Sequence, residues 1–290
     1  MKYCFERDSM PAMVTNSDPT VSVIIPTLNR GWVLREAIES VLAQEYANVE
    51  LIVVNDGSTD DTKDILAGYE GITVLEQPNR GVSAARNSGV ARSRGLLIAF
   101  LDSDDIWLPE KLSAQVDFFR KNPEALICQT QEIWLRNGRR VNSGKRHQKQ
   151  SGMFFERSLE LCLVSPSAVM MKKVFFEEMG RFDESLPACE DYDLWLRVNV
   201  HHPIYLIDRP LIVKRGGHQD QLSANPGLDK YRIQSIIKLI DSGGLTPEQA
   251  SVAMQVMKRK CGIYAAGCRK RGRLDEAARY LEIMEAYTID

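Results

Sequence analysis

The chain has 290 residues, of which 44% are hydrophobic and 26% charged, and its formal net charge at pH 7 is −2. This near-neutral balance gives no reason to expect a nucleic acid as partner, and no apolar run approaches the roughly 18 residues of a membrane-spanning helix. The six cysteines are scattered without a CxxC pair, which is typical of reduced thiols and predicts a cytoplasmic protein.

Residues 1–19 lack the continuous apolar core of a signal peptide, and we interpret them as a flexible tail. Short β-branched runs then alternate with helical segments. The predicted strands are residues 21–26, 49–54, 72–77 and 95–102, and the predicted helices are residues 31–44, 60–69, 81–94 and 109–122. This strict alternation predicts an α/β fold with a mainly parallel central sheet that is covered by helices on both faces.

The pattern is less regular after Asn122. A strand or two is predicted in 125–136, a basic, turn-rich loop in 136–150, a helix in 189–200 and a strand in 204–208. Three helices are predicted near the end of the chain, at 228–241, 247–268 and 274–287. We therefore expect one α/β domain over residues 20–218 and a helical C-terminal extension over residues 219–290.

Polar residues follow the predicted parallel strands. Sheets of this kind bind ligands beyond the carboxyl ends of their strands. Of the four segments at those ends, three are rich in Asp, Asn or Gly; the four are residues 26–30, 55–60, 79–81 and 102–105. A purely structural sheet does not need this clustering along one edge, so the pattern predicts a ligand site there.

Five segments occur in the order seen in family 2 glycosyltransferases: VSVIIPTLNR, VVNDGSTDDT, NRGVSAARNSGV, FLDSDDIWLP and GRFDESLPACEDYDLWLR. Through them, residues 20–218 resemble inverting enzymes with the GT-A fold. The resemblance implies a nucleoside-diphosphate sugar as donor, with UDP expected as the nucleotide, a divalent metal (Mn²⁺ or Mg²⁺) and an aspartate base.

The first acidic group consists of Asp102, Asp104 and Asp105. Capping of the helix that begins near Pro109 is one explanation, but three carboxylates exceed what a cap needs. A hard divalent cation relieves their repulsion, and Mg²⁺ usually takes only one or two protein carboxylates. By resemblance, Asp104 is the metal ligand, while Asp102 and its neighbour Ser103 belong to the donor site. Asp105 is either a residue that supports this site or a cap.

The nucleotide is expected at the ends of the first two strands. By resemblance, Asp56 accepts a hydrogen bond from the base, which suits the imide N–H of uracil; an Asx turn with Gly57 is the structural alternative. The remaining candidate donor-binding residues are Pro26, Thr27, Asn29, Arg80 and Arg86. For Arg86, pairing with a carboxylate of the cleft and orientation of Asp102 or of a phosphate both stay open.

The second acidic group contains Glu190, Asp191 and Asp193. An acceptor hydroxyl is a poor nucleophile until a carboxylate takes its proton. By resemblance Asp191 is this base, and Glu190 is either a contact of the acceptor or a helper of the base. Helix capping is the structural alternative for Asp191. Asp193 and Arg197 are four residues apart, which favours a surface ion pair.

The loop after the last predicted strand contains Lys214, Arg215 and His218. By resemblance His218 is a further metal ligand, and a structural or surface histidine is its alternative. Lys214 and Arg215 are either contacts of the diphosphate or ordinary solvated side chains.

Together these features predict an inverting, metal-dependent glycosyltransferase that moves a sugar to a hydroxyl of a glycan, lipid-linked or protein acceptor. A nucleotidyltransferase is the first alternative, but it needs a Gly-rich phosphate loop, and PTLNRGW has a single Gly. A catalytically silent binding module is the second. The basic stretches 136–149 and 258–273 are either solvated faces or sites of peripheral contact with an anionic membrane.

Overall fold

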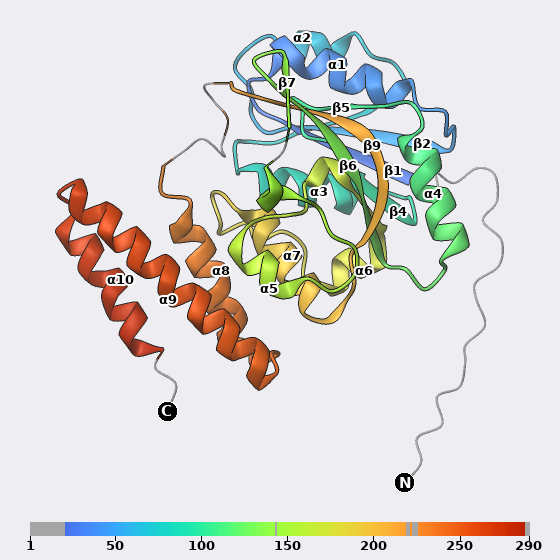
Figure 1. Cartoon of the computed structure of the whole chain (residues 1–290). Helices are drawn as coiled ribbons and strands as arrows, with labels where there is room; N and C mark the ends of the chain where they lie inside the picture. Colours follow the sequence, from blue (N-terminus) through green and yellow to red (C-terminus); the bar gives the residue numbers. More distant parts are fainter. Residues whose placement is uncertain (1–20, 143, 219–220, 222–225, 288–290) are drawn as a thin grey trace.

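The computed structural model describes residues 21–142, 144–218, 221 and 226–287 (Figure 1). The predicted tail, residues 1–19, lies outside the described residues. The strands are β1 (Val21–Thr27), β2 (Val49–Asn55), β3 (Thr73–Glu76), β4 (Leu97–Phe100), β5 (Ile106–Trp107), β6 (Ile127–Arg136), β7 (Arg139–Val141), β8 (Val169–Lys172) and β9 (Tyr205–Gly216). The α-helices are α1 (Gly31–Leu42), α2 (Thr62–Ala67), α3 (Val82–Arg92), α4 (Lys111–Lys121), α5 (Phe155–Glu160), α6 (Lys173–Glu178), α7 (Glu190–His201), α8 (Asp229–Asp241), α9 (Pro247–Lys270) and α10 (Leu274–Ala286).

One sheet runs through the molecule in the order β3-β2-β1-β4-β8-β6-β9-β5, with β7 paired to β6. The four N-terminal strands are parallel, as predicted. Beyond β4 the sheet is mixed, because β8 runs antiparallel to both β4 and β6 while β9 runs parallel to β6. The predicted α/β fold with a mainly parallel central sheet is confirmed.

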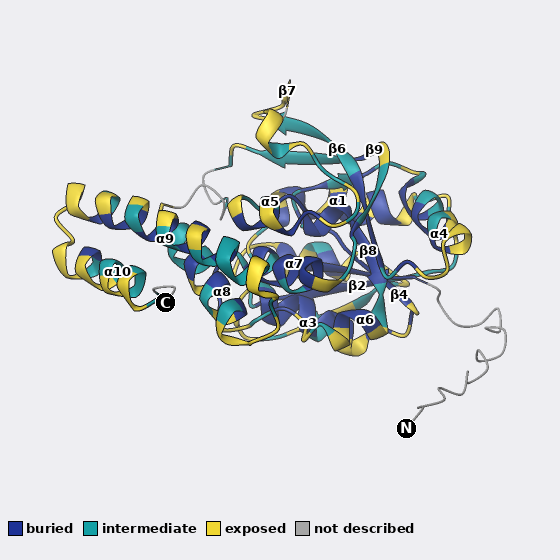
Figure 2. Cartoon of the chain, turned by 60° about the horizontal axis from the view of Figure 1, so that its bottom comes forward, coloured by how far each residue is buried: buried dark blue, intermediate teal, exposed yellow. Residues whose placement is uncertain are grey.

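Two apolar cores cover the two faces of the parallel strands. Alternate residues of a strand point to opposite faces. Thus Val23 of β1 packs with Leu34 of α1, whereas Ile24 packs with Ala85 of α3 and Trp195 of α7. Figure 2 shows the resulting buried centre. Trp195 is a buried part of this core, with 2% of its surface exposed.

Small residues on α3 let this helix lie directly on the sheet. A Cβ atom built on Gly89 would come within 2.5 Å of the Ile24 side chain. Any larger residue at this position would push α3 away from β1. The position of α3 is important because it carries Arg86 into the site described below.

The three C-terminal helices agree with the prediction to within two residues at each end. Helix α9 starts with a capping box in which Thr246 and Gln249 bond each other's backbone N–H groups. A third apolar core joins α8 and α9 to α5 and α7, and α10 packs along α9 (Figure 1). Among the described helices, none is both long and apolar enough to cross a membrane. The division of the chain after residue 218 stays a prediction.

Some boundaries differ from the prediction. Helix α4 begins at Lys111 and has Glu110 as its N-cap, so Pro109 precedes the helix instead of lying in its first turn. The strand predicted at 204–208 continues to Gly216, since β9 bulges around Pro210, where extra residues of β9 lie opposite Thr130–Glu132 of β6. This extension brings Lys214 and Arg215 to the edge of the sheet where the acidic residues lie.

Candidate active site

The loops after β1 and β2 are joined at the carboxyl edge of the sheet. The side-chain oxygen of Asn29 accepts a hydrogen bond from the N–H of Thr59 at 2.8 Å, and the N–H of Asn29 donates to Ser58 Oγ at 2.9 Å. Asn29 adopts a φ of 52°, a left-handed conformation that Asn tolerates better than most residues. Thr27 is buried next to this junction. Asn29 is therefore fixed as a structural link between the two loops, and its proposed donor contact remains a proposal.

Asp56 is only 3% exposed, and it holds the segment that follows β3 through hydrogen bonds. Its carboxylate accepts hydrogen bonds from Gln77 Nε2 at 2.6 Å and from the N–H groups of Arg80 at 2.9 Å and Gly81 at 2.8 Å. Gly57 follows with a φ of +84°, and a Cβ there would come within 2.8 Å of the Asn79 nitrogen. A carboxylate has about four acceptor positions, so about one remains for a ligand.

Arg80 reaches this pocket through its backbone and not through its guanidinium. The Arg80 side chain pairs with Glu184 at 2.8 Å and is 57% exposed. The predicted contact of Arg80 with the donor would therefore involve its backbone and not its side chain. The backbone N–H of Arg80 already donates to Asp56.

The first acidic group forms the turn after β4. Asp105 is 2% exposed and accepts hydrogen bonds from Ser167 Oγ at 2.7 Å and from the N–H of Arg215 at 3.0 Å. Burial raises the pKa of Asp105 to about 8, although Lys214 opposes this shift. Through these two buried hydrogen bonds Asp105 stabilises the turn. It does not cap α4, because the N-cap residue of α4 is Glu110. Ser103 is buried in the same turn.

The side chain of Asp104 is less buried than that of Asp105 and faces Arg30. Its carboxylate is 18% exposed and lies 3.7 Å from Arg30 Nη1. Burial and the nearby charge of Asp102 raise the pKa of Asp104, whereas Arg30 and His218 lower it. Thus the imidazole of His218 lies near enough to affect the Asp104 carboxylate.

Arg86 connects the two acidic groups. Its guanidinium bonds Asp102 Oδ1 through Nη2 and Glu190 Oε1 through Nη1, each at 2.6 Å, and its side chain is only 4% exposed. Burial would lower the pKa of Arg86, but the two carboxylates raise it above its usual value. The sequence left two roles open for Arg86, pairing with a carboxylate and orienting Asp102. The structure shows both contacts, because Arg86 pairs with Glu190 and also bonds Asp102.

We expect Arg86→Met to lower the free energy of unfolding by about 3–5 kcal/mol, because it leaves two largely buried carboxylates without their partner. Urea denaturation followed by circular dichroism measures this change. Arg86→Lys is the matched control that keeps the charge but cannot bridge both carboxylates in the same planar geometry. Stability of the Met variant equal to that of the wild type would show that the bridge is dispensable for folding.

The second acidic group lies in the first turn of α7, where the helix dipole favours negative charge. Cys189, with a φ of 63°, is the N-cap residue, so Asp191 is not the cap. Asp191 accepts the N–H of Tyr192 at 2.7 Å and the Cys162 thiol at 3.4 Å. Glu190 is buried, and burial raises its pKa against the opposing effect of Arg86.

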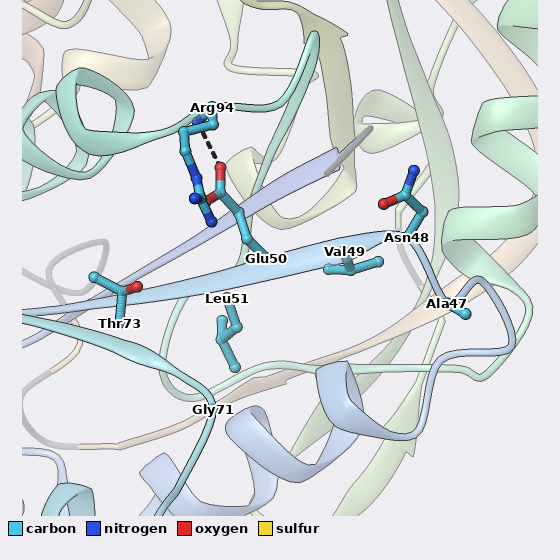
Figure 3. A pocket seen from close by; sticks show the side chains of 8 residues that line it. All are labelled: Ala47, Asn48, Val49, Glu50, Leu51, Gly71, Thr73 and Arg94. Carbon is cyan, nitrogen blue, oxygen red and sulfur yellow. Dashed lines mark hydrogen bonds and ion pairs between the residues drawn. The ribbon is translucent and has the colours of Figure 1, made fainter. Parts of the chain in front are cut away.

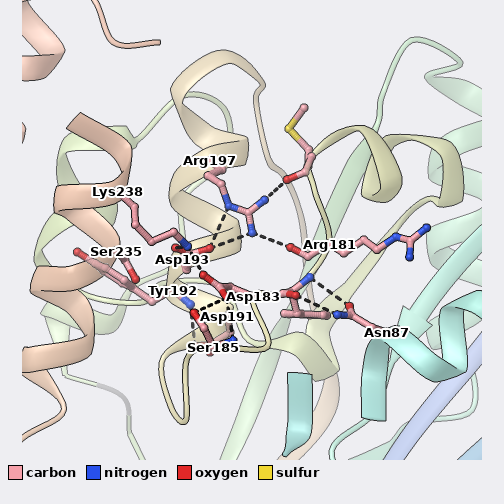
Figure 4. Close-up of polar contacts among 12 residues, drawn as sticks. Asn87, Arg181, Asp183, Ser185, Asp191, Tyr192, Asp193, Arg197, Ser235 and Lys238 are labelled. Carbon is pink, nitrogen blue, oxygen red and sulfur yellow. Dashed lines mark hydrogen bonds and ion pairs between the residues drawn. The ribbon is translucent and has the colours of Figure 1, made fainter. Parts of the chain in front are cut away.

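Asp193 forms the predicted pair with Arg197, with its Oδ2 2.9 Å from Nη2, but this pair is not on the surface. Asp193 is 2% exposed and also bonds Lys238 of α8 at 2.9 Å (Figure 4). Lys238 bonds Asp183 as well. The C-terminal extension is thereby attached to the helix that carries Glu190 and Asp191.

We expect Lys238→Met to lower the free energy of unfolding by about 1 kcal/mol at neutral pH, since Lys238 is partly exposed and Arg197 still neutralises Asp193. The pKa of Asp183 is lowered to about 2 because Lys238 and Ser185 outweigh the effect of burial. The stabilisation is therefore present above the ordinary pKa of 3.8 and is lost as the pH falls towards 2. Melting curves between pH 2 and 7 should show the difference between wild type and variant shrinking in acid, while Lys230→Met on the same helix should behave like the wild type.

The metal prediction rests on Asp104 and His218. The Nε2 atom of His218 is buried and has no hydrogen-bond partner among the described residues, and its ring packs edge-on against Trp32 at 4.7 Å between centroids. Within the described part of the chain, no group of three or more His, Cys, Asp or Glu side chains is arranged to hold an ion. The donor set fits a divalent cation that takes two protein ligands and obtains the others from phosphate and water.

One surface hollow lies away from this site. It has a volume of about 250 Å³ and lies at the opposite, amino end of β2, between Ala47, Gly71 and Arg94 (Figure 3). Glu50 in its wall already accepts hydrogen bonds from Ser22, Arg94 and Gly95. This hollow has no unpartnered acid that would suggest chemistry, so the two acidic groups at the strand ends remain the candidate site.

Sequence reasoning missed Cys162, Ser167 and Lys238, which hold the acidic residues in place. Ser167 donates to Asp105 and accepts the N–H of Asp102 at 3.0 Å. These contacts span 62 and 65 residues, and no local pattern in the sequence signals them.

Comparison with known proteins decides the family. The model of "Glycosyl transferase family 2" matches residues 22–180, more than half of the chain. The chain belongs to glycosyl transferase family 2. The matched region includes Asp56, Arg86 and the first acidic group, and it ends before the second.

Several curated glycosyltransferases are similar to this family member. An uncharacterized glycosyltransferase of Rickettsia prowazekii is 34% identical, with 70% of this chain and 65% of the relative covered. The Escherichia coli enzyme UDP-Glc:alpha-D-GlcNAc-diphosphoundecaprenol beta-1,3-glucosyltransferase WfgD is 32% identical (62% and 70% covered). The putative teichuronic acid biosynthesis glycosyltransferase TuaG of Bacillus subtilis is 31% identical (63% and 73% covered). The chain spans only 37% of the length of the Rickettsia felis relative.

Solved structures show the same fold. S. aureus TarS 1-349 in complex with UDP-GlcNAc matches with a TM-score of 0.68 at 19% identity, with 87% of this chain and 74% of TarS covered. The mannosyltransferase PcManGT from Pyrobaculum calidifontis, in complex with GDP-Man and Mn²⁺, matches with a TM-score of 0.61 at 16% identity, with 98% and 80% covered. The family member described here therefore has the GT-A fold.

Proposed function

We propose that this family 2 glycosyltransferase moves a sugar from a UDP-linked donor to an acceptor hydroxyl with inversion, in the synthesis of a cell-surface polysaccharide or glycoconjugate. The observation that carries the proposal is the Arg86 bridge, because one guanidinium holds Asp102, proposed for the donor side, next to Glu190, proposed for the acceptor side. UDP is favoured since TarS was solved with UDP-GlcNAc and WfgD uses UDP-Glc.

In this proposal Asp56 accepts a hydrogen bond from the uracil ring at its remaining acceptor position. Thr27 and Pro26 line the base and ribose pocket, and Asp102, held by Arg86, bonds the ribose. Asp104 and His218 hold a divalent metal, which supplies positive charge to the departing diphosphate when bound.

Asp191 takes the proton of the acceptor hydroxyl, whose oxygen attacks the anomeric carbon from the side opposite the diphosphate. The bond from that carbon to the phosphate oxygen breaks, and its electron pair leaves with the nucleoside diphosphate. Glu190 keeps its place beside Arg86 and supports the base. Because WfgD acts on a diphosphoundecaprenol acceptor, we favour a lipid-linked acceptor and hence a cytoplasmic protein in peripheral contact with the membrane.

A thermal-shift panel of UDP-, GDP- and dTDP-sugars with and without Mn²⁺ tests the donor. We expect a UDP-sugar to raise the melting temperature most, and to do so more strongly with Mn²⁺. Turnover of a UDP-sugar should release UDP, whereas a nucleotidyltransferase, which attacks the phosphate attached to the uridine, would release the sugar phosphate. A silent binding module would release neither. A metal-independent shift with a GDP-sugar alone would contradict both the nucleotide and the metal assignment.

A further inference from the structure

Two neighbouring basic residues near the end of β9 have different environments. Arg215 is bound to the protein: its guanidinium pairs with Glu36 at 2.8 Å and bonds the carbonyl of Asp104, while its N–H donates to Asp105 at 3.0 Å. Adjacent residues of a strand point to opposite faces, so Lys214 points elsewhere. Arg215 therefore fixes the acidic turn, and Lys214 needs a separate explanation.

Lys214 is not the ordinary solvated lysine that is one of its two predicted roles. Its Nζ donates to Ser165 Oγ at 3.1 Å. Burial would lower the pKa of Lys214, but the carboxylates around it raise the pKa above its usual value, so the ammonium stays charged. These carboxylates belong to Glu132, Asp105, Asp102 and Asp191.

The segment 162–167 connects Lys214 to residues that bond both acidic groups. Cys162 at one end of the segment donates to Asp191 at 3.4 Å, and Ser167 at the other end donates to Asp105 at 2.7 Å. Ser165, the partner of Lys214, lies between them in the chain. The ammonium is thus attached to the segment that links the acceptor side of the cleft to its donor side.

Glu132 is the strongest carboxylate neighbour of Lys214 but not the only one, because Asp105, Asp102 and Asp191 also raise the pKa of Lys214. Glu132 already pairs with Lys149 at 2.8 Å and accepts the Trp134 indole N–H at 2.8 Å. Lys149 and Lys214 together lower the pKa of Glu132 to about 2, against the effect of burial. Lys149 is therefore sufficient as the direct partner of Glu132, and it offers a matched control.

We propose that Lys214 binds the diphosphate of the donor as a fixed second cation beside the metal. This role rests on the proposed function. An ammonium has three donors, of which Ser165 takes one, and it binds phosphate as a compact point charge. As the bond between the anomeric carbon and the phosphate oxygen breaks, its electron pair goes to that oxygen, and Lys214 hydrogen-bonds the diphosphate without giving up its proton.

Calorimetric titration of UDP and UMP, in EDTA and in Mn²⁺, tests the role of Lys214. We expect Lys214→Met to bind UDP at least about tenfold more weakly than the wild type, also in EDTA, because a charge-assisted hydrogen bond to phosphate is lost. We expect the Lys214 ammonium to act mainly on the second phosphate of UDP, which UMP lacks. UMP binding should therefore change by less than about threefold. Lys149→Met should retain the wild-type preference for UDP.

Unchanged UDP binding by folded Lys214→Met, or an equal loss in Lys149→Met, would overturn the role of Lys214 alone. Wild-type protein that binds neither UDP nor GDP would contradict the proposed function as well. For the case that Lys214→Met does not fold, the wild type gives a second measurement. A fixed cation beside the metal predicts that the wild type binds UDP more tightly than UMP even in EDTA, and equal binding of the two nucleotides in EDTA would also overturn the role.

Discussion

Asp191→Asn is expected to reduce kcat by about 10²- to 10⁴-fold, the usual contribution of a positioned general base. An amide keeps the shape of the side chain and can still accept the Tyr192 N–H, but it cannot take the proton of the acceptor. Since Asp191 lies in the acceptor-side group, UDP-sugar binding should stay within about threefold of the wild type. Initial rates of UDP release and calorimetric donor titration measure the two quantities.

Asp193→Asn is the matched control on the same helix. Asp193 is 2% exposed and bonded to Arg197 and Lys238, so its loss should lower stability more than kcat. Near wild-type turnover by Asp191→Asn would show that another group is the base. Equal losses of kcat in both variants would mean that the effect is a disturbance of α7.

Asp104→Ala is expected to abolish the effect of Mn²⁺ on UDP binding and to lower kcat by about 10²-fold or more, because metal stabilisation of a leaving group is worth several kcal/mol. The variant should fold, since Asp104 is partly exposed and its pairing distance to Arg30 is 3.7 Å. Titration of UDP with and without Mn²⁺ measures the loss.

Asp105→Asn, in the same turn, serves as the control for Asp104. Asp105 is buried against Ser167 and the Arg215 N–H, so its replacement should lower the melting temperature while leaving a Mn²⁺ effect on UDP binding. A Mn²⁺ effect that persists in Asp104→Ala would remove Asp104 from the metal site. If it disappeared only in His218→Ala, the histidine would be the principal ligand.

The parallel half of the fold was predictable because local signals agree there. Residues of β1 such as Val23 and Ile24 are buried on both faces, and a continuous β-branched run reflects that burial directly. The carboxyl ends of β2 and β4 must then share an edge, so Asp56 and Asp102 could be assigned to one site without coordinates. The resemblance, not the pattern, assigned their individual roles.

The connections between distant segments could not be predicted. The Arg86–Glu190 bond spans 104 residues, and the sequence around each partner is equally compatible with a surface ion pair. The last strand was expected over residues 204–208, yet β9 continues to Gly216 because it bulges around Pro210 and then pairs with β6 again. As a result Lys214, which follows that proline by four residues, was considered as a loop residue and not as a buried cation.

The anomeric configuration of the first-formed product tests the proposed reaction most directly. Proton NMR can follow the sugar released early from an α-linked UDP-sugar with Mn²⁺, with water as acceptor and before the anomers equilibrate. A direct displacement assisted by Asp191 predicts that the β anomer appears first, together with UDP, and that Asp191→Asn releases far less. Initial release of the α anomer would contradict the single inverting displacement.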